Sequence, residues 1–316
     1  MQLIRGLHNL RACHKRFSEG CILTIGNFDG IHLGHQQVLE TLCQTAKQSG
    51  LPTVVMIFEP LPIEYFSPRT APVRLMNLRE KLQAFSETRI DYVLCMPFNE
   101  AFANLTAQAF VEQVLVEALN IKHLVIGDDF RFGKGRRGDY AYLQKAGEAF
   151  DFSVTDMPTF CRQEERVSST RIRAALQTPD LEEAQSLLGR SFAFSGRVIH
   201  GQKLGRTIGF PTLNLNPKRI QMPVMGVFAV WVDGIAERPW PGVANIGLRP
   251  TVDGIRPSIE VHLFDWDQDL YGRHIEVNLA YYIRPEMKFD GLDALKRQIA
   301  KDAGQAREFF AACERK

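Results

Sequence analysis

The sequence lacks any long hydrophobic run. Its longest apolar stretches, such as residues 53–58, are far shorter than the ~20 residues that a membrane-spanning helix needs. The first ten residues include Arg5 and His8 and have no apolar segment of the kind found in a secretory signal. We therefore expect a protein that works in the cytoplasm and has no membrane partner.

Cysteine is sparse and shows no pattern. The six cysteines are scattered and no two form a CxxC pair, so we do not expect a zinc site. Without an export signal, reduced thiols in a cytoplasmic protein are the plain interpretation. The sequence also has no internal repeat and no low-complexity tract, which excludes repeat architectures.

Neither sign of charge is in excess. Lysine and arginine number 38 against 36 aspartates and glutamates, a net charge of +2. Such a balance does not provide the excess of positive charge that binding to duplex nucleic acid requires, although local clusters of basic residues could still bind phosphates. We expect small-molecule substrates and no nucleic-acid partner, and the sequence does not indicate an oligomeric state.

The length of 316 residues indicates two domains, since it is about twice the commonest domain size of ~150 residues. In the first half, short apolar runs alternate with segments of helical periodicity. The expected strands are residues 21–25, 53–58, 92–96, 123–126 and 152–155; the expected helices start at about residue 32 and cover 77–88, 106–119 and 140–149. This alternation predicts a parallel, doubly wound sheet, whose ligands bind at the carboxyl ends of the strands.

Beyond about residue 185 the period changes from helical to alternating. A helical stretch at 176–188, with Gly189 as its C-cap, precedes expected strands at 227–232, 258–264 and 274–283. The Asp233-Gly234 pair is a hairpin signal. Short strands with many glycine and proline turns predict a small antiparallel barrel, and residues 292–310 have the apolar stripe of a closing helix.

The strongest chemical signal is residues 26–35, GNFDGIHLGH. A strand leads into a turn rich in glycine, and a helix follows. Glycines let the backbone approach a ligand closely, and a helix N-terminus offers free N–H groups and a positive dipole to phosphate. His32 and His35 could then donate hydrogen bonds to phosphate oxygens and stabilise the charge that develops during nucleotidyl transfer.

A second segment, residues 166–173 (RVSSTRIR), supplies hydroxyl and guanidinium donors suited to phosphate. Taken alone, it is equally a basic helix start with a Ser/Thr cap. The pair of segments resembles the nucleotidyltransferases that carry an HxGH motif, in which a Ser/Thr/Arg motif late in the domain contacts phosphates.

A third segment, residues 127–133 (GDDFRFG), follows a strand and mixes carboxylates with aromatic rings. Aromatic rings beside charged groups suit a flat ligand that carries a phosphate. For Phe58, Phe66, Phe130 and Phe132 taken singly, we expect core packing in preference to ligand stacking.

The second half has its own loop of phosphate-binding type, residues 196–214 (GRVIHGQKLGRTIGFPTLN), which is not a Walker P-loop. Thr212 and Asn214 are two residues apart, so an extended backbone puts both side-chain oxygens on one face, where they could ligate Mg²⁺. Glu260, in an expected strand, could take a proton from a substrate hydroxyl. The same alternation is equally compatible with a plain outward-facing strand residue.

Together these residues resemble the bacterial bifunctional riboflavin kinase/FMN adenylyltransferase (FAD synthetase) family. The resemblance covers nearly the whole chain and includes segments without an assigned role. These are LLGR at 187–190, GVANIG at 242–247, RPTV at 249–252, DLYG at 269–272 and RPEMKF at 284–289. One difference is Leu213, where the family usually has alanine, and the alternation points Leu213 away from the expected metal.

The resemblance implies a Rossmann-like, doubly wound adenylyltransferase domain at residues 1–186, then a β-barrel riboflavin kinase domain with a C-terminal helix at 187–316. The barrel would convert riboflavin and ATP to FMN with Mg²⁺, and the first domain would convert FMN and ATP to FAD and pyrophosphate. The implied catalytic residues are His32, His35, Arg166 and Glu260, and the metal ligands are Thr212 and Asn214. The implied flavin contacts are Phe58, Asp129 and Phe132. The implied ATP and phosphate contacts are Gly26, Phe28, Asp29, Gly30, Gly34, Ser169, Thr170, Arg173, Gly201, Lys203, Gly205, Arg206 and Gly209.

Two alternatives stay open at this point. HxGH enzymes with a single activity act on pantetheine phosphate, nicotinate mononucleotide or glycerol phosphate, but they lack a second-half barrel with this loop. A flavin-binding or RNA-binding module without catalysis is the other alternative, and turnover of riboflavin and ATP would distinguish it.

Overall fold

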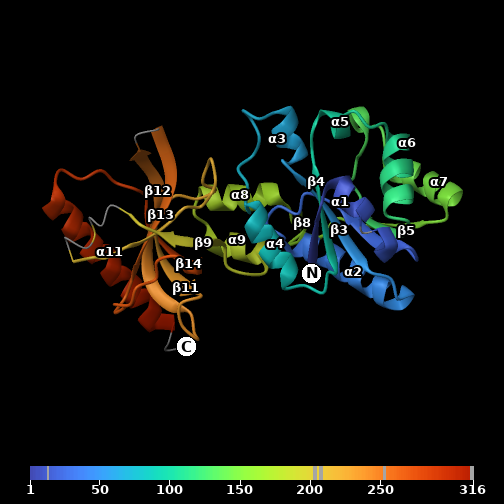
Figure 1. The fold of residues 1–316 in the computed structure, drawn as a ribbon. Helices are drawn as coiled ribbons and strands as arrows, with labels where there is room; N and C mark the ends of the chain where they lie inside the picture. Colours follow the sequence, from blue (N-terminus) through green and yellow to red (C-terminus); the bar gives the residue numbers. More distant parts are fainter. Residues whose placement is uncertain (13, 202–204, 206–208, 252–253, 314–316) are drawn as a thin grey trace. The chain divides into compact units, whose positions relative to one another are not determined.

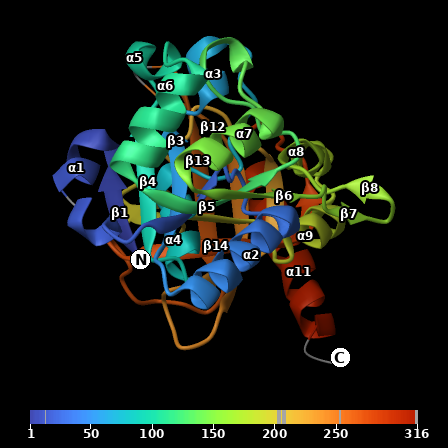
Figure 2. The same cartoon turned by 90° about the vertical axis from the view of Figure 1, so that its right-hand side faces the viewer.

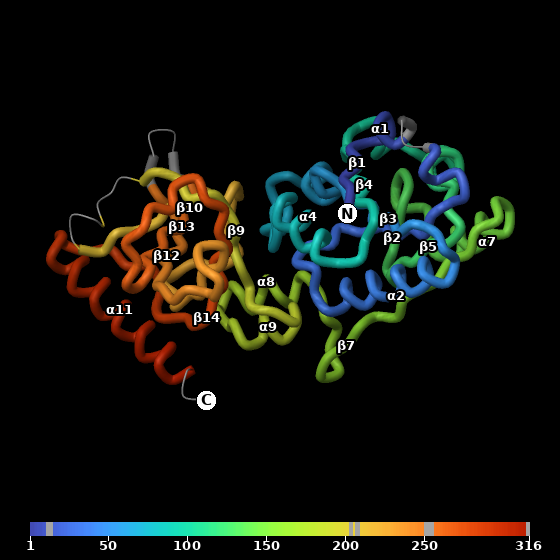
Figure 3. The backbone as a smooth tube through the Cα atoms, turned by 60° about the horizontal axis from the view of Figure 1, so that its bottom comes forward, coloured from blue at the N-terminus to red at the C-terminus, as the bar shows by residue number. Residues whose placement is uncertain are grey.

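The structure is a computed structural model that describes residues 1–12, 14–201, 205, 209–251 and 254–313. The chain forms two compact units, which can be followed in Figures 1 and 3. One comprises Met1–Pro72 with Leu78–Ser168, and the other Val73–Asn77 with Ser169–Lys316. No helix in the described ranges has both the length and the apolar character that crossing a membrane requires.

The first unit is built on a six-stranded sheet in the order β1-β4-β3-β2-β5-β6, in which every neighbouring pair is parallel. Its strands are β1 (Gln2–Arg5), β2 (Cys21–Ile25), β3 (Thr53–Glu59), β4 (Tyr92–Pro97), β5 (Ile121–Gly127) and β6 (Ser153–Met157). The predicted parallel sheet is confirmed. The edge strand β1 was not predicted, because its two apolar residues are too few to show a period.

Strand order determines which helices cover each face of this sheet. From β2 through α2 (Leu33–Ser49) to β3, and through α4 (Leu78–Ser86) to β4, the chain moves toward β1. From β4 through α6 (Ala107–Phe110) and η2 (Val111–Ala118) to β5, and through α7 (Tyr140–Phe150) to β6, it moves the other way. Right-handed crossovers in opposite directions place these two sets of helices on opposite faces, as Figure 2 shows.

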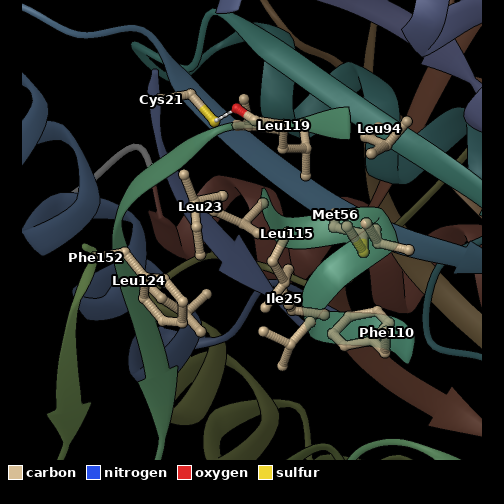
Figure 4. Packing of buried hydrophobic residues seen from close by; sticks show 14 of the residues in the cluster. Cys21, Leu23, Ile25, Met56, Leu94, Phe110, Leu115, Leu119, Leu124 and Phe152 are labelled. Carbon is tan, nitrogen blue, oxygen red and sulfur yellow. Dashed lines mark hydrogen bonds between the residues drawn. The ribbon is translucent and has the colours of Figure 1, made fainter. Parts of the chain in front are cut away.

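The central strand β2 is buried along its whole length. On one face its side chains Leu23 and Ile25 share a core with Met56, Phe110 and Leu115, shown in Figure 4. The predicted helix at 106–119 begins where expected, with the Thr106 hydroxyl capping it, but its larger part is the π-helix η2. The shorter elements are α1 (Gly6–Ala12), η1 (His14–Phe17), α3 (Pro62–Phe66), α5 (Glu100–Ala103), η3 (Lys134–Arg136), β7 (Cys161–Arg162) and β8 (Glu165–Arg166).

The single helix predicted at 176–188 is wrong. The structure has α8 (Ser169–Gln177) and α9 (Leu181–Leu188), and the chain between them turns at Pro179. Asp180 then starts α9 by accepting a hydrogen bond from the Glu183 N–H. The predicted C-cap at Gly189 is confirmed by its left-handed conformation.

The second unit contains a closed barrel in the order β10-β13-β12-β11-β14-β9, with antiparallel neighbours. Its strands are β9 (Ala193–Ile199), β10 (Leu213–Leu215), β11 (Gly226–Asp233), β12 (Trp240–Thr251), β13 (Gly254–Leu263) and β14 (His274–Arg284). Helix α11 (Leu292–Cys313) packs Ala303, Ala306 and Phe310 against its outer face. The predicted barrel and closing helix are confirmed, and the Asp233-Gly234 hairpin is present with a loop of residues 234–239 in place of a two-residue turn.

The strap, residues 73–77, is a piece of the first half of the chain that belongs to the second unit. Arg173 Nε donates to the Val73 carbonyl at 2.6 Å, and an Arg219 guanidinium nitrogen donates to the Arg74 carbonyl at 2.6 Å. Asn77 Nδ2 donates to the Pro217 carbonyl at 3.3 Å. Arginines on α8 and beyond β10 therefore hold a segment that precedes them by 100 and 145 residues in the chain.

A buried ion pair fixes α11 on the barrel. Arg284 at the end of β14 donates two hydrogen bonds to the Asp302 carboxylate, at 3.0 and 2.7 Å, and Gln298 donates a third at 2.8 Å. The Arg284 side chain is 15% exposed and that of Asp302 only 4%. The carboxylate is thus satisfied entirely by groups of the second unit.

Replacing Asp302 by alanine is expected to lower the free energy of unfolding of the second unit by about 3–5 kcal/mol, because the Arg284 guanidinium would stay buried without a counter-charge. Urea unfolding followed by the fluorescence of Trp231, which packs on α11, measures this effect. Asp265→Ala is the matched control, since the Asp265–Arg307 pair is exposed and is expected to contribute little. Equal losses in the two variants would contradict the prediction.

Candidate functional site

In the first unit, the turn between β2 and α2 contains residues with positive φ, a backbone conformation that few residues other than glycine adopt. Phe28 and Ile31 have φ values of 47° and 43°, and Gly30 has 89°. The Phe28 ring is buried under the turn, and a Cβ on Gly26 would lie 3.0 Å from it. A glycine at position 26 therefore allows β2 to end directly against this ring. The buried ring in turn fixes the conformation of the turn before α2 begins.

The two histidines of the motif lie side by side at the N-terminus of α2. His32 is the N-cap, and its Nδ1 accepts a hydrogen bond from the His35 N–H at 3.3 Å. The two rings stack with centroids 3.7 Å apart. Because Nδ1 of His32 accepts, the neutral ring carries its proton on Nε2 and can donate from there.

Gly34 leaves room beside the His32 ring. A Cβ at position 34 would lie 3.3 Å from the His32 ring and 3.4 Å from the Phe160 side chain. The HxGH spacing thus reflects packing as well as chemistry: the histidines supply the rings and the glycine leaves room for them.

His35 is held in its neutral form. Burial lowers the pKa of His35 well below its ordinary value, and electrostatic repulsion from the neighbouring His32 ring and from the Lys81 ammonium group lowers it further. Its Nδ1 is buried and has no hydrogen-bond partner among the described residues. A neutral imidazole with an unsatisfied buried nitrogen is suited to a hydrogen bond with a ligand.

Lys81 is a site residue that sequence reasoning missed. It lies on α4, is 2% exposed, and its Nζ donates to the Asn27 carbonyl at 2.5 Å. A buried ammonium group next to the motif provides positive charge where a phosphate would bind. No local pattern in residues 77–88 could have indicated it, because the strand order alone brings α4 beside this turn.

The segment after β5 is held by two contacts of its aspartates. Arg166 donates to the Asp129 carboxylate at 2.5 Å, and the Thr159 hydroxyl donates to Asp128 at 2.6 Å. Arg166 and Asp129, predicted for different roles, are therefore partners. Both are more than half exposed, so a ligand can reach either of them.

Of the predicted flavin contacts, Phe132 is 7% exposed and belongs to the core cluster, where it packs against Phe110, Phe130 and Tyr142. Phe58 is half-buried at the end of β3. It continues the cluster of rings to Phe98, which in turn contacts Tyr65 and Phe66 on α3. Phe66 is 64% exposed, so the core packing expected for this ring is wrong and it forms an aromatic surface.

Ser169, Thr170 and Arg173 lie in the first turns of α8, which belongs to the second unit. Ile172, Ala175 and Leu176 form the buried side of this helix. Ser169 is half-buried and Thr170 exposed, while Arg173 is anchored to the strap through Nε.

In the barrel, strand register aligns three polar residues in one row. Asn214 of β10 pairs with Glu260 of β13, and Glu260 pairs with Asn245 of β12. Ile259 and Val261, on either side of Glu260, are fully buried and point to the opposite face. Glu260 therefore points outward, in line with Asn214, and Asn245 is an addition that the sequence analysis left without a role.

Two glycines of the loop pack directly against the predicted metal ligands. A Cβ on Gly201 would lie 2.3–2.7 Å from the Asn214 amide, and a Cβ on Gly205 would lie 3.3 Å from the Thr212 hydroxyl. Thr212 immediately precedes β10, so its oxygen and that of Asn214 are two residues apart. Oxygen donors beside glycines that leave the space open fit a magnesium ion. Lys203 and Arg206 lie outside the described residues, and Gly209 has φ 87° with open space around it.

Gly201→Ala is expected to reduce the riboflavin phosphorylation that the resemblance implies by about 100-fold, because the new methyl group must displace the Asn214 amide by an ångström or more. Separate assays of FMN formation from riboflavin and of FAD formation from FMN measure this, and the second rate should be unchanged. Gly304→Ala on α11 is the control, since no atom lies within 4 Å of the added Cβ. If Gly201→Ala phosphorylates riboflavin at the wild-type rate, the position of the Asn214 side-chain amide is not important for this reaction.

The two sites define a class of protein. A parallel sheet with paired histidines at a helix N-terminus suits nucleotidyl transfer, and a barrel with a glycine loop, two neighbouring side-chain oxygens and one outward carboxylate suits phosphoryl transfer.

Comparison with known proteins agrees with this class. The FAD synthetase family matches residues 14–171, and the riboflavin kinase family matches residues 188–310. The chain is 55% identical over 310 residues to the bifunctional riboflavin kinase/FMN adenylyltransferase of Escherichia coli K12, covering 98% of each chain. It is 49% identical to the protein of that name from Haemophilus influenzae, covering 98% of this chain and 99% of that one.

The chain therefore belongs to the bifunctional riboflavin kinase/FMN adenylyltransferase family. Among solved structures it is similar to a Streptococcus pneumoniae chain named a macrolide-efflux protein, with a TM-score of 0.75 and 33% identity over 91% of this chain and 94% of that one. From this structure we take the shared fold. An HxGH enzyme with a single activity would match over the first half alone, and here both halves match.

Proposed function

We propose that this chain carries the two activities of its family in two separate sites, one in residues 1–186 and one in residues 187–316. The barrel phosphorylates riboflavin with ATP to give FMN and ADP, and the sheet domain adenylylates FMN with a second ATP to give FAD and pyrophosphate. The observation that carries the proposal is the row of Asn214, Glu260 and Asn245 beside two glycines, a second phosphate site besides the histidine motif.

In the barrel, Thr212 and Asn214 would hold Mg²⁺, which neutralises the charge of the ATP phosphates when bound. Glu260 would accept the proton of the riboflavin 5′-hydroxyl as its oxygen attacks the γ-phosphorus and the bond to ADP breaks. Gly201, Gly205 and Gly209, with Lys203 and Arg206, would wrap the phosphates. The outward direction of Glu260 equally fits a plain surface residue, and its pairing with Asn214, the proposed metal ligand, supports the catalytic role.

In the sheet domain, a phosphate oxygen of FMN would attack the α-phosphorus of ATP, and pyrophosphate would leave. No strong base is needed, because the FMN phosphate is already anionic. Nε2 of His32 and the neutral ring of His35 would donate to phosphate oxygens, with Lys81 supplying charge. Gly26, Phe28, Asp29, Gly30 and Gly34 would shape the nucleotide site. Ser169, Thr170 and Arg173 would steady the pyrophosphate, and Arg166 would assist once it leaves Asp129.

For the flavin, we keep Phe58, Asp129 and Phe132 as proposed contacts and add Phe66. Phe58 is half-buried beside the exposed rings, and Phe132 forms part of the core below them. An isoalloxazine ring would stack on this aromatic surface. The enzyme would work in the cytoplasm, where the free thiols of Cys21, Cys43, Cys95, Cys161 and Cys313 stay reduced.

Incubation with riboflavin, ATP and Mg²⁺, with the flavins resolved over time, tests the function directly. We expect FMN to appear first and FAD to follow. FAD formation from added FMN without any FMN formation from riboflavin would reduce the protein to a single activity. Flavin binding without turnover of ATP would favour the non-catalytic module.

A further inference from the structure

His262 lies two residues beyond Glu260 on β13 and therefore on the same outward face of the barrel. Its Nδ1 is 2.8 Å from the carbonyl oxygen of Pro211. A carbonyl oxygen can only accept, so Nδ1 carries the proton and donates it. Pro211 is the residue directly before Thr212, the proposed metal ligand.

Pro211 lies just outside the ladder of β10. The pairing of β10 with β13 begins at Leu213, and Pro211 has no N–H to contribute to a ladder. On the loop side, the Phe210 N–H donates to the Gly205 carbonyl at 2.8 Å. The Phe210 ring packs edge-on against His262, with centroids 5.4 Å apart. The segment 210–212 is thus held between Gly205 and the imidazole of His262.

We infer that His262 is a positioning residue for riboflavin phosphorylation: its Nδ1–H holds the Pro211 carbonyl and thereby sets the Thr212 hydroxyl where it can share a metal ion with Asn214. This inference rests on the proposed metal role of Thr212 and Asn214. His262 lies two residues from the proposed base Glu260 but has a different role, because its Nδ1 already donates a hydrogen bond to the Pro211 carbonyl.

Two substitutions separate the hydrogen bond from the ring. His262→Asn keeps an N–H donor at the position of Nδ1, whereas His262→Gln carries its amide farther out, near the position of Nε2. A positioning role through Nδ1 predicts function in the Asn variant and loss in the Gln variant. A direct contact of the outer ring nitrogen with substrate predicts the reverse order.

The experiment measures metal binding as well as turnover. Mn²⁺ binding to the full chain in the presence of ADP is followed by electron paramagnetic resonance, and the Mg²⁺ concentration for half-maximal FMN formation is determined in parallel. We expect His262→Gln to weaken Mn²⁺ binding and raise the Mg²⁺ requirement by ~10-fold or more, the usual effect of losing a group that orients a metal ligand. His262→Asn should stay within about threefold of wild type on the same scale.

Thr212→Val distinguishes failure of the inference from failure of the metal assignment. If Thr212→Val leaves Mn²⁺ binding unchanged, the proposed metal role is wrong and the inference falls with it. If Thr212→Val weakens binding and His262→Gln does not, or if the Asn and Gln variants behave alike, the inference alone is overturned. FAD formation from FMN should be unchanged in every variant, which shows that the domain without the substitution stays folded and active.

Discussion

Replacing His32 by alanine is expected to stop FAD formation while FMN continues to accumulate. His32 is the N-cap of α2, its ring stacks on His35, and its Nε2 carries the proton that it would donate to a phosphate oxygen. Loss of one donor that stabilises charge developing in a transition state costs about 100- to 1,000-fold in rate. The barrel contains none of these groups, so riboflavin phosphorylation should be unaffected.

The role of His32 as the N-cap of α2 can be tested separately from its role in FAD formation. Alanine removes the N-cap acceptor as well as the ring, and loss of a cap costs about 1 kcal/mol. His32→Asn restores a good cap without an imidazole, so it should be as stable as wild type and still fail to make FAD. Assays that start from FMN, with melting temperatures measured on the same samples, give both quantities. FAD formation by the Asn variant at the wild-type rate would remove His32 from the reaction.

Glu260→Gln is expected to reduce riboflavin phosphorylation by about 100- to 10,000-fold, the range for loss of a positioned general base. The substitution keeps the size and the outward direction of the side chain between Asn214 and Asn245 and removes the charge that accepts the proton. Thr212→Ala should also stop phosphorylation, through loss of the metal ligand. In both variants, conversion of added FMN to FAD should proceed as in wild type.

A matched carboxylate serves as the control for this second experiment. Glu308 is exposed on α11, and Glu308→Gln makes the same chemical change away from the row of polar residues. It should leave both activities at the wild-type level. If Glu260→Gln phosphorylates riboflavin normally, Glu260 is the plain outward-facing strand residue that its alternation equally allowed.

Most of the sheet could be predicted because parallel strands buried on both faces are continuous apolar runs, as β2 and β3 are. The elements that were missed lack such a signal. β1 has only two apolar residues, and the break between α8 and α9 is made by Pro179 inside a pattern whose apolar spacing continues across it. The π-helical part of η2 has the same apolar residues that an α-helix would have, so periodicity could not distinguish the two.

The residues of the candidate sites also divide into those that a local sequence pattern indicates and those that it does not. The histidine motif is contiguous, so its turn, its cap and its stacked rings all follow from ten neighbouring residues. Lys81 enters this site from another helix, and Asn245 enters the barrel row from another strand. Nothing near Lys81 or Asn245 in the sequence marks them, because their positions depend on which strands become neighbours.

The sequence alone determined two domains, a parallel sheet followed by a barrel, and two candidate phosphate-binding segments, because local spacing encodes secondary structure and contiguous motifs. Only the tertiary structure decided that Arg166 pairs with Asp129, that Gly201 leaves room for Asn214, and that His262 holds Pro211. Each of these contacts joins residues that are far apart in the chain or lie on different strands. Strand order, register and close packing set the distances between such residues, and no local pattern contains them.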